Sequence, residues 1–114
     1  MKIVSFNVNS VRMRQHQLQA LVDQYQPDII GLQETKVHDD QFPLADIESL
    51  GYKVEYFGQK THYGVALMYK PEHQLTAVQK GWLTDDEDAQ RRMIIGDFIT
   101  AKGESLRVIN GYFP

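Results

Sequence analysis

The stretch Ile29-Ile30-Gly31-Leu32-Gln33-Glu34-Thr35-Lys36 decides how the rest of the chain is interpreted, together with Phe6-Asn7-Val8-Asn9 near its start. Residues 29–32 form a short apolar run, which is the composition of a buried parallel strand. The run ends abruptly in Gln33 and Glu34. A carboxylate at the carboxyl end of a buried strand lies where open α/β sheets bind ligands. Taken alone, such a glutamate more often closes a strand in a solvated loop, so the neighbouring segments must decide its role.

The flanking segments predict a strand–helix–strand unit. Residues 2–8 alternate apolar and mixed positions, which indicates a strand. Asn9 or Ser10 can cap a helix over about 11–25, where apolar residues recur at helical spacing. Pro27 stops this helix, and residues 28–34 supply the second strand. Because strand–helix–strand crossovers are right-handed and place the strands side by side and parallel, we expect Asn7 and Glu34 at the same edge of the sheet.

The rest of the chain has an antiparallel character. A short helical stretch at 42–50 is stopped by Gly51. Strands are predicted at 52–57, 64–69 and 75–83, and a hairpin joins 93–100 to 106–113 across 101–104. A parallel start followed by antiparallel strands predicts a mixed sheet and an α/β (α+β) fold.

Composition places the chain among soluble globular domains. It has 114 residues, 42% of them hydrophobic and 24% charged, with no cysteine, which excludes disulfides and thiolate metal sites. There is no apolar run of about eighteen residues, so no membrane span or membrane partner is expected. The N-terminus turns polar too early for a signal peptide, and a cytoplasmic location is the expectation.

The net charge of −3 does not suggest a nucleic-acid binder, although Asp85-Asp86-Glu87-Asp88 alone contributes four negative charges. We interpret that run, and His38-Asp39-Asp40, as solvated loops, because successive residues converge poorly on one ion. Basic residues could still gather on one face; they are Arg12, Arg14, Lys36, Lys60, Arg91 and Arg92.

Glu34 is the candidate metal ligand, because a Mg²⁺ site typically uses only one or two carboxylates and keeps several waters. Asn7 could hold Glu34 or a phosphate oxygen through its amide. The alternative for Asn7 is a strand-end residue that bonds its own backbone. Asn9 is assigned no role in this site, because it is more simply explained as the helix cap.

Three later segments are candidates for phosphate contacts. Tyr63-Gly64, after His62, could approach a nucleic-acid backbone, or Gly64 could simply serve a turn. Arg91 and Arg92 are either surface charge or bidentate phosphate ligands. The Tyr112 hydroxyl, at the end of the last strand, either bonds a phosphate or completes the core.

Four motifs together resemble the exonuclease III family, the bacterial abasic-site endonucleases of the endonuclease/exonuclease/phosphatase superfamily. They occur in the same order and at similar spacing over the whole chain: Phe6-Asn7-Val8-Asn9, Gly31-Leu32-Gln33-Glu34-Thr35-Lys36, His62-Tyr63-Gly64-Val65-Ala66 and Asn110-Gly111-Tyr112-Phe113-Pro114. Ser10-Val11 and Asn9 depart from the commonest family pattern, and the second departure favours the bacterial branch.

The resemblance implies a four-layer sandwich of two mixed sheets with helices outside, of which residues 1–114 would be the N-terminal half. It implies hydrolysis of DNA phosphodiesters that depends on Mg²⁺, or on Mn²⁺, acting 3′ to 5′ on duplex ends and 5′ to abasic sites. By position, Glu34 and Asn7 would be the metal and catalytic residues, and Tyr112 would hold the scissile phosphate. DNA contacts would come from Tyr63, Gly64, one of Arg91 and Arg92, and, less directly, Arg12 and Lys36.

Family chains continue well beyond this one, and their later motifs, which supply the groups near the attacking water, are absent here. We therefore expect the chain alone to be inactive. We also expect it to supply essentially one sheet and to expose the inter-sheet face, with Val4, Phe6, Val8, Ile30, Leu32, Val65 and Leu67, unless a C-terminal half or self-association covers it. Two rival functions are a lipid or inositol phosphodiesterase, which shares the Leu-Gln-Glu strand end, and a non-catalytic DNA-binding or interaction fragment.

Overall fold

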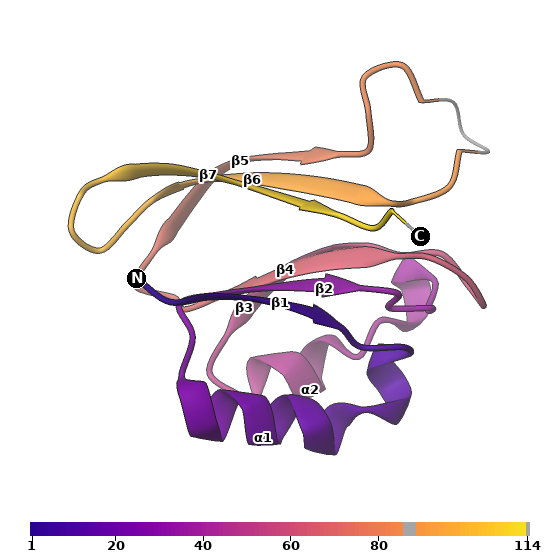
Figure 1. Ribbon diagram of the computed structural model, residues 1–114, viewed down its shortest axis with the longest axis horizontal. Helices are drawn as coiled ribbons and strands as arrows, with labels where there is room; N and C mark the ends of the chain where they lie inside the picture. Colours follow the sequence, from indigo (N-terminus) through magenta and orange to yellow (C-terminus); the bar gives the residue numbers. More distant parts are fainter. Residues whose placement is uncertain (86–88, 114) are drawn as a thin grey trace.

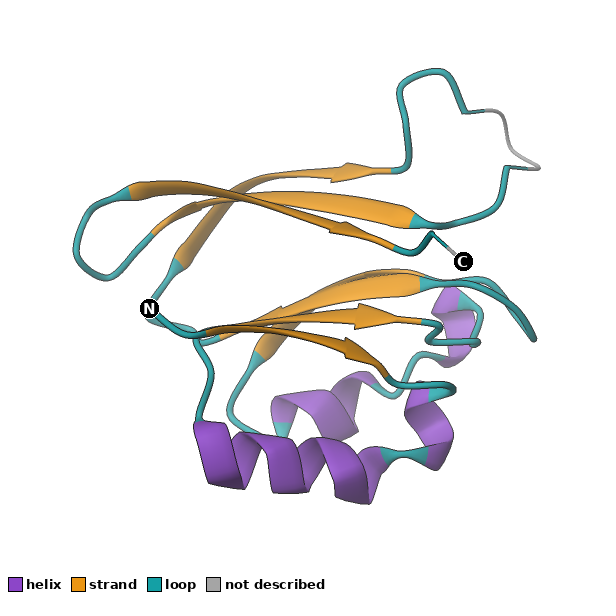
Figure 2. Ribbon diagram, in the orientation of Figure 1, coloured by secondary structure: helices purple, strands orange, loops and turns teal. Residues whose placement is uncertain are grey.

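The computed structural model describes residues 1–85 and 89–113 as two β-sheets packed face to face, with helices beneath one of them (Figures 1 and 2). The elements are β1 (Ile3–Asn7), a 3₁₀ turn (Val11–Met13), α1 (Gln15–Tyr25), β2 (Ile29–Gln33), a second 3₁₀ turn (Asp39–Gln41), α2 (Leu44–Glu48), β3 (Lys53–Phe57), β4 (Val65–Tyr69), β5 (Gln74–Lys80), β6 (Met93–Ile99) and β7 (Ser105–Gly111). Within this described part, no helix has the length and apolar character that a bilayer crossing requires.

The first sheet has the order β1-β2-β4-β3 and confirms the predicted mixed topology. β1 and β2 are parallel, as the crossover through α1 requires, and β4 pairs antiparallel with both β2 and β3. All five residues of β2 and all five of β4 are buried, because helices cover one face of these central strands and the second sheet covers the other.

The second sheet is antiparallel, with the order β5-β6-β7, and it includes the predicted hairpin. The expectation that the chain supplies one sheet and exposes its inter-sheet face is therefore wrong. Val65 and Leu67 are buried against Ile94 and Phe98 of the second sheet. Val8, Ile30 and Leu32 point the other way and are buried with the helices, while Val4 and Phe6 are half-buried at the sheet edge. The alternation of apolar and polar residues predicted the strands, but it did not predict which faces of the two sheets would pack together.

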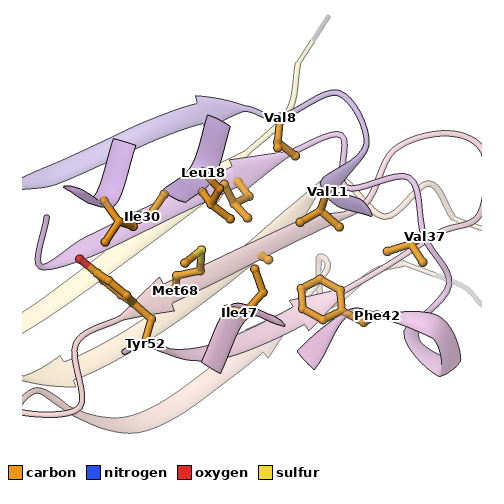
Figure 3. Close-up of a cluster of buried hydrophobic side chains, with 12 residues drawn as sticks. Val8, Val11, Leu18, Ile30, Val37, Phe42, Ile47, Tyr52 and Met68 are labelled. Carbon is orange, nitrogen blue, oxygen red and sulfur yellow. The ribbon is translucent and has the colours of Figure 1, made fainter. Parts of the chain in front are cut away.

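The helix-side core fixes the elements that lead into the candidate site (Figure 3). Leu18 from α1, Ile47 from α2 and Met68 from β4 are fully buried there. Phe42 stacks on Tyr56 with ring centroids 4.0 Å apart, so the segment before α2 is fixed against β3. Each such side chain contributes about 1.5–3 kcal/mol of burial free energy.

The helix after β1 begins later than predicted. A 3₁₀ turn precedes α1, and neither Ser10 nor Arg14, the residues before the two helical segments, makes a side-chain cap. Asn9 and Ser10 have left-handed backbones, with φ of 46° and 82°. The prediction that one of them caps the helix is therefore wrong, and Asn9 instead accepts a hydrogen bond from Lys36 Nζ at 2.7 Å.

At the end of the sandwich away from the carboxyl ends of β1 and β2, buried His73 joins the two sheets. Its Nε2 lies 2.9 Å from Asp28 Oδ1, and its Nδ1 accepts the Ala101 backbone N–H at 3.0 Å. Asp28 Oδ2 also accepts the Lys2 backbone N–H at 2.8 Å. The Lys2 bond first, and the His73 bond second, hold the pKa of Asp28 below its usual value.

Substituting Asp28 by Asn should lower the free energy of unfolding by about 1–3 kcal/mol at neutral pH, because two hydrogen bonds to a carboxylate are weakened. A lowered pKa in the folded state means that this stabilisation is present above about pH 4 and is lost as the pH falls through the folded value. Urea unfolding at pH 7 and pH 3 should therefore show a larger difference between parent and variant at pH 7 than at pH 3. An equal difference at both pH values would contradict the assignment.

Candidate active site

The parallel pairing of β1 and β2 brings Asn7 and Glu34 together, as predicted. Asn7 pairs with Gln33 in the strand register, and the ladder continues past both strands. The Val8 N–H donates to Gln33 O at 3.0 Å, and the Ser10 N–H donates to Glu34 O at 2.9 Å. The two segments that leave the strands are thus joined along their backbones, and both functional side chains rise from one rigid edge.

Tyr112 reaches this edge from the second sheet. It follows β7, and its backbone N–H donates to Arg92 O at 2.8 Å. Hydrogen bonding from its hydroxyl is the largest cause that lowers the pKa of the Glu34 carboxylate; Asn7 and the charge of Lys36 lower it further, while partial burial opposes them. The same bond to Glu34 raises the pKa of Tyr112. The site therefore pairs an ionised carboxylate with a protonated phenol.

Asn7 fills both roles that its sequence context allowed. Its Oδ1 accepts the Asn9 backbone N–H at 3.2 Å, which is the strand-end turn. Hydrogen bonding from its amide also contributes to the lowered pKa of Glu34, and a carboxylate can only accept from the Nδ2 donor. Asn7 thus orients Glu34, and its oxygen already has a donor.

The donor set fits Mg²⁺ in part. Among the described residues, no three His, Cys, Asp or Glu side chains gather in a way that could hold a metal ion. Glu34 is a single carboxylate at an accessible strand end, and Mg²⁺ is commonly held by one or two carboxylates together with waters and substrate phosphates. Glu34 would be the ligand that this chain supplies, and Asn7 would support it.

The loops around Glu34 have an unusual backbone. Glu34, Lys36 and Tyr63 have φ of 56°, 55° and 59°, in the left-handed backbone region that residues other than glycine rarely adopt. The Thr35 N–H donates to Gly64 O at 3.1 Å, and the Lys36 N–H donates to Tyr63 O at 2.9 Å. Strained backbone of this kind clusters at functional sites, where the surrounding structure holds it in place.

Gly64 is a glycine for two reasons in this setting. Its φ is +88°, and a Cβ added to it would overlap the Thr35 hydroxyl. Substituting Gly64 by Ala should lower the free energy of unfolding by about 2–4 kcal/mol, which combines backbone strain and a clash. Gly103 is the matched control, because it has φ +82° but open space around it. Thermal unfolding should show a clearly smaller loss for Gly103→Ala, and equal losses would remove the steric role of Thr35.

The two candidate arginines have different surroundings. The Arg91 guanidinium donates to Gly58 O at 2.6 Å, lies 3.4 Å from Asp39 Oδ2 and stacks on the Phe57 ring. Arg92 lies 4.9 Å from the centroid of the Tyr63 ring, and its charge acts on Tyr112. Arg91 therefore joins three loops to one another, whereas Arg92 lies beside the site.

The structure describes all of one acidic cluster, His38-Asp39-Asp40, and part of the other, residues 85–88. Asp39, predicted to be solvated, accepts the Gly58 N–H at 2.7 Å besides its pairing with Arg91, so that prediction is wrong for Asp39. Asp85 accepts the Trp82 N–H at 2.8 Å, and residues 86–88 lie outside the described residues. Of the other predicted basic contacts, Arg12 is exposed and donates to Gln41 at 3.3 Å, and Lys36 is half-buried and donates to Asn9.

Sequence reasoning missed two buried polar residues behind the site. Gln33 and Asn110 are 7% and 5% exposed, and they hydrogen-bond each other between the sheets. A signal was available, because Asn110 interrupts the apolar inward positions of β7 between Val108 and Tyr112.

The comparison with known proteins matches this arrangement. The profile of the Endonuclease/Exonuclease/phosphatase family matches residues 4–110. The chain belongs to the endonuclease/exonuclease/phosphatase family. Exodeoxyribonuclease III of Haemophilus influenzae is 54% identical over 114 residues, which are the whole of this chain and 42% of that protein. Bacillus subtilis exodeoxyribonuclease is 32% identical over 118 residues, covering the whole chain and 43% of that protein.

Solved structures of the family share the fold. A Neisseria 3′ phosphatase bound to a product DNA hairpin has a TM-score of 0.83 and 37% identity, covering 98% of this chain and 41% of that one. An AP endonuclease from Archaeoglobus fulgidus has a TM-score of 0.83 and 36% identity, covering 100% and 41%. The chain thus spans less than half the length of these family members.

Proposed function

We propose that the chain is the N-terminal part of a Mg²⁺-dependent DNA-repair nuclease that hydrolyses phosphodiesters at abasic sites and at 3′ ends. The observation that carries the proposal is the Asn7–Glu34–Tyr112 constellation, in which two sheets deliver an ionised carboxylate and a protonated phenol to one point. The names of the family relatives support DNA as the substrate class.

Each residue of the constellation has a distinct task. Bound Mg²⁺, or Mn²⁺ in its place, would supply Lewis-acid polarisation of a phosphoryl oxygen and stabilise the departing 3′ oxygen. Glu34 would hold that ion, and Asn7 keeps the Glu34 carboxylate in one orientation through its amide. The Tyr112 hydroxyl would turn from Glu34 to a non-bridging phosphate oxygen and donate to the charge that develops in the transition state.

Contacts to the DNA backbone would come from the loops around the constellation. Tyr63 and Gly64 lie on the loop that is bonded to residues 35 and 36. Arg92 is the better candidate of the two arginines, since Arg91 is already engaged with Gly58 and Asp39. Lys36 and Arg12 lie on the loops that follow β2 and β1, and they would extend the basic edge along the phosphates.

The groups that activate the attacking water would come from the rest of a longer protein. The test is a nicking assay on a fluorescent duplex with one abasic-site analogue, in Mg²⁺ and in EDTA. It compares this chain alone with the complemented chain, which we define as this chain mixed with the C-terminal remainder of the Haemophilus relative. We expect Mg²⁺-dependent nicking by the complemented chain and none by the chain alone. Nicking by the chain alone would overturn the division of the site, and no nicking by the complemented chain would overturn the proposed function.

A non-catalytic DNA-binding role is the second candidate, favoured because Glu34 is not part of any group of three metal-binding side chains among the described residues. That role predicts duplex binding in EDTA without turnover in the complemented chain. A lipid or inositol phosphodiesterase would instead cleave its phosphoester and leave the abasic duplex intact.

The outer face of the second sheet also needs a partner under this proposal. Ile109 is 64% exposed there, and Ile95 lies beside it in register. The remainder of a longer protein would cover this face, and self-association of the chain is the alternative. Sedimentation should show association of the chain alone and a one-to-one complex with the added remainder.

A further inference from the structure

A buried amide on the second sheet is bonded to the first sheet just behind the candidate site. Asn110 lies on the inward face of β7, and its Nδ2 donates to Leu32 O at 2.9 Å and to Ala66 O at 2.8 Å. These two carbonyls belong to a register pair of β2 and β4. Both Nδ2 hydrogens are therefore used on the backbone of the opposite sheet.

The acceptor side of the same amide is bonded to the residue before Glu34. Gln33 Nε2 donates to Asn110 Oδ1 at 2.7 Å and to Ser5 Oγ at 3.0 Å. The bond to Ser5 ties Gln33 to β1 as well. Gly31 makes room for this contact, because a Cβ there would lie 3.0 Å from the Asn110 side chain. A single amide thus touches β2 and β4 through the backbone and β1 through Gln33.

The position of this amide sets the position of the site. Tyr112 is two residues beyond Asn110, and Glu34 is two residues beyond Leu32. β7 and β2 run in the same direction, with their carboxyl ends at the same side (Figure 1). Since two residues of a strand span about 6.6 Å, the hydrogen bonds of Asn110 lie within about one such step of both Tyr112 and Glu34, so they act on the alignment of the two sheets close to that pair.

Apolar packing between the sheets does not provide this register. Ile94 and Phe98 pack on Val65 and Leu67 through non-directional contacts, which tolerate small shifts of one sheet over the other. Hydrogen bonds to fixed backbone carbonyls require one alignment. We propose that Asn110 and Gln33 are positioning residues, which set the register between the two sheets so that the Tyr112 hydroxyl meets the Glu34 carboxylate.

The first test does not involve catalysis. In the full chain, the Tyr63 and Tyr112 rings lie 6.5 Å apart between centroids, so a nuclear Overhauser effect between them reports the alignment of the sheets at the site. Asn110→Leu keeps the side-chain volume and removes the directional bonds, and it should abolish this effect. Val108→Ala is the matched control, which weakens the same packing without touching the amide, and it should retain the effect. Persistence of the effect in a folded Asn110→Leu variant would overturn the proposal.

The second test rests on the proposed function and uses nicking by the complemented chain. Because misplacing a reacting group by about 1 Å can reduce a rate about 10²-fold, Asn110→Leu should lower kcat by up to that factor and leave KM unchanged. In a Tyr112→Phe background the same substitution should lower kcat less than about threefold, since the hydroxyl that it positions is gone. Equal losses in both backgrounds would overturn the positioning role.

Gln33→Met provides a second variant, in case Asn110→Leu fails to fold. It leaves both carbonyl bonds of Asn110 intact and removes the bonds that Gln33 donates to Asn110, Ser5 and Gly31. It should weaken the Tyr63–Tyr112 effect and lower kcat by a smaller factor; no change in either measurement would exclude Gln33. If the complemented chain of natural sequence does not nick DNA, the proposed function fails, while the nuclear Overhauser comparison still decides the alignment.

Discussion

Replacing Glu34 by Gln should reduce Mg²⁺-dependent nicking by the complemented chain about 10³-fold or more. The substitution keeps the shape of the side chain and the acceptor for Tyr112, but it removes the charge that would hold the metal ion. Loss of metal-assisted charge stabilisation costs several kcal/mol, and each 1.36 kcal/mol is a factor of ten in rate. The measurement is the single-turnover nicking rate on an abasic-site duplex over a range of Mg²⁺ concentrations.

Glu104→Gln is the control for this experiment, because Glu104 is an exposed glutamate next to the β6–β7 turn, at the far end of the sandwich. It removes the same charge and should leave the rate within a factor of two or so, as surface substitutions generally do. If high Mg²⁺ restored the Glu34→Gln rate fully, Glu34 would contribute only to metal affinity. A rate unchanged at all Mg²⁺ concentrations would remove Glu34 from the site.

Replacing Tyr112 by Phe should lower kcat about 10²-fold with little change in KM. One donor to the developing phosphate charge is lost, and removing one preorganised donor costs about 10²–10³ in rate. The exposed Tyr25 at the end of α1 is the matched control, and Tyr25→Phe should have no effect on kcat. A rise in KM with kcat unchanged would instead assign Tyr112 to ground-state binding.

The same variant should change the pH dependence of nicking. The hydrogen bond from Tyr112 is the largest contribution that lowers the pKa of Glu34. Without it, that pKa rises toward its usual value, so the carboxylate becomes protonated at a higher pH. The acidic limb of kcat/KM, which reports the free enzyme, should move to higher pH in Tyr112→Phe. An acidic limb at the same or a lower pH would contradict the Tyr112–Glu34 bond.

The part of the fold that rests on local pattern could be predicted from sequence. β1, α1 and β2 follow from an apolar run, helical spacing and Pro27, and the right-handed crossover then predicts that Asn7 lies beside Glu34, which the register of β1 and β2 confirms. The hairpin of β6 and β7 follows from alternation and the turn at 101–104. These features depend on residues close in sequence or on a rule of handedness.

The remaining features depend on contacts between distant segments. Alternation in β5, β6 and β7 shows that one face is apolar, but it does not say that this face packs on β4, and so a second sheet went unrecognised. Left-handed φ at Glu34 and Lys36 is imposed by backbone bonds to Tyr63 and Gly64, which no local propensity encodes. The pairing of Arg91 with Asp39 spans 52 residues and was invisible for the same reason.

The His73 bonds to Asp28 and Ala101 lie at one end of the sandwich, and the Tyr112–Glu34 bond lies at the other. A rotation of one sheet against the other about the turn from β4 to β5, here called the spine, would therefore move the Tyr112 end of the second sheet farthest. β7 has seven residues and is about 24 Å long, so a rotation of about 3° at the spine displaces its far end by about 1 Å. A displacement of that size is enough to separate a phenol from a carboxylate. A substitution at the spine would thus reduce turnover through the distant Tyr112–Glu34 pair before it unfolds the chain.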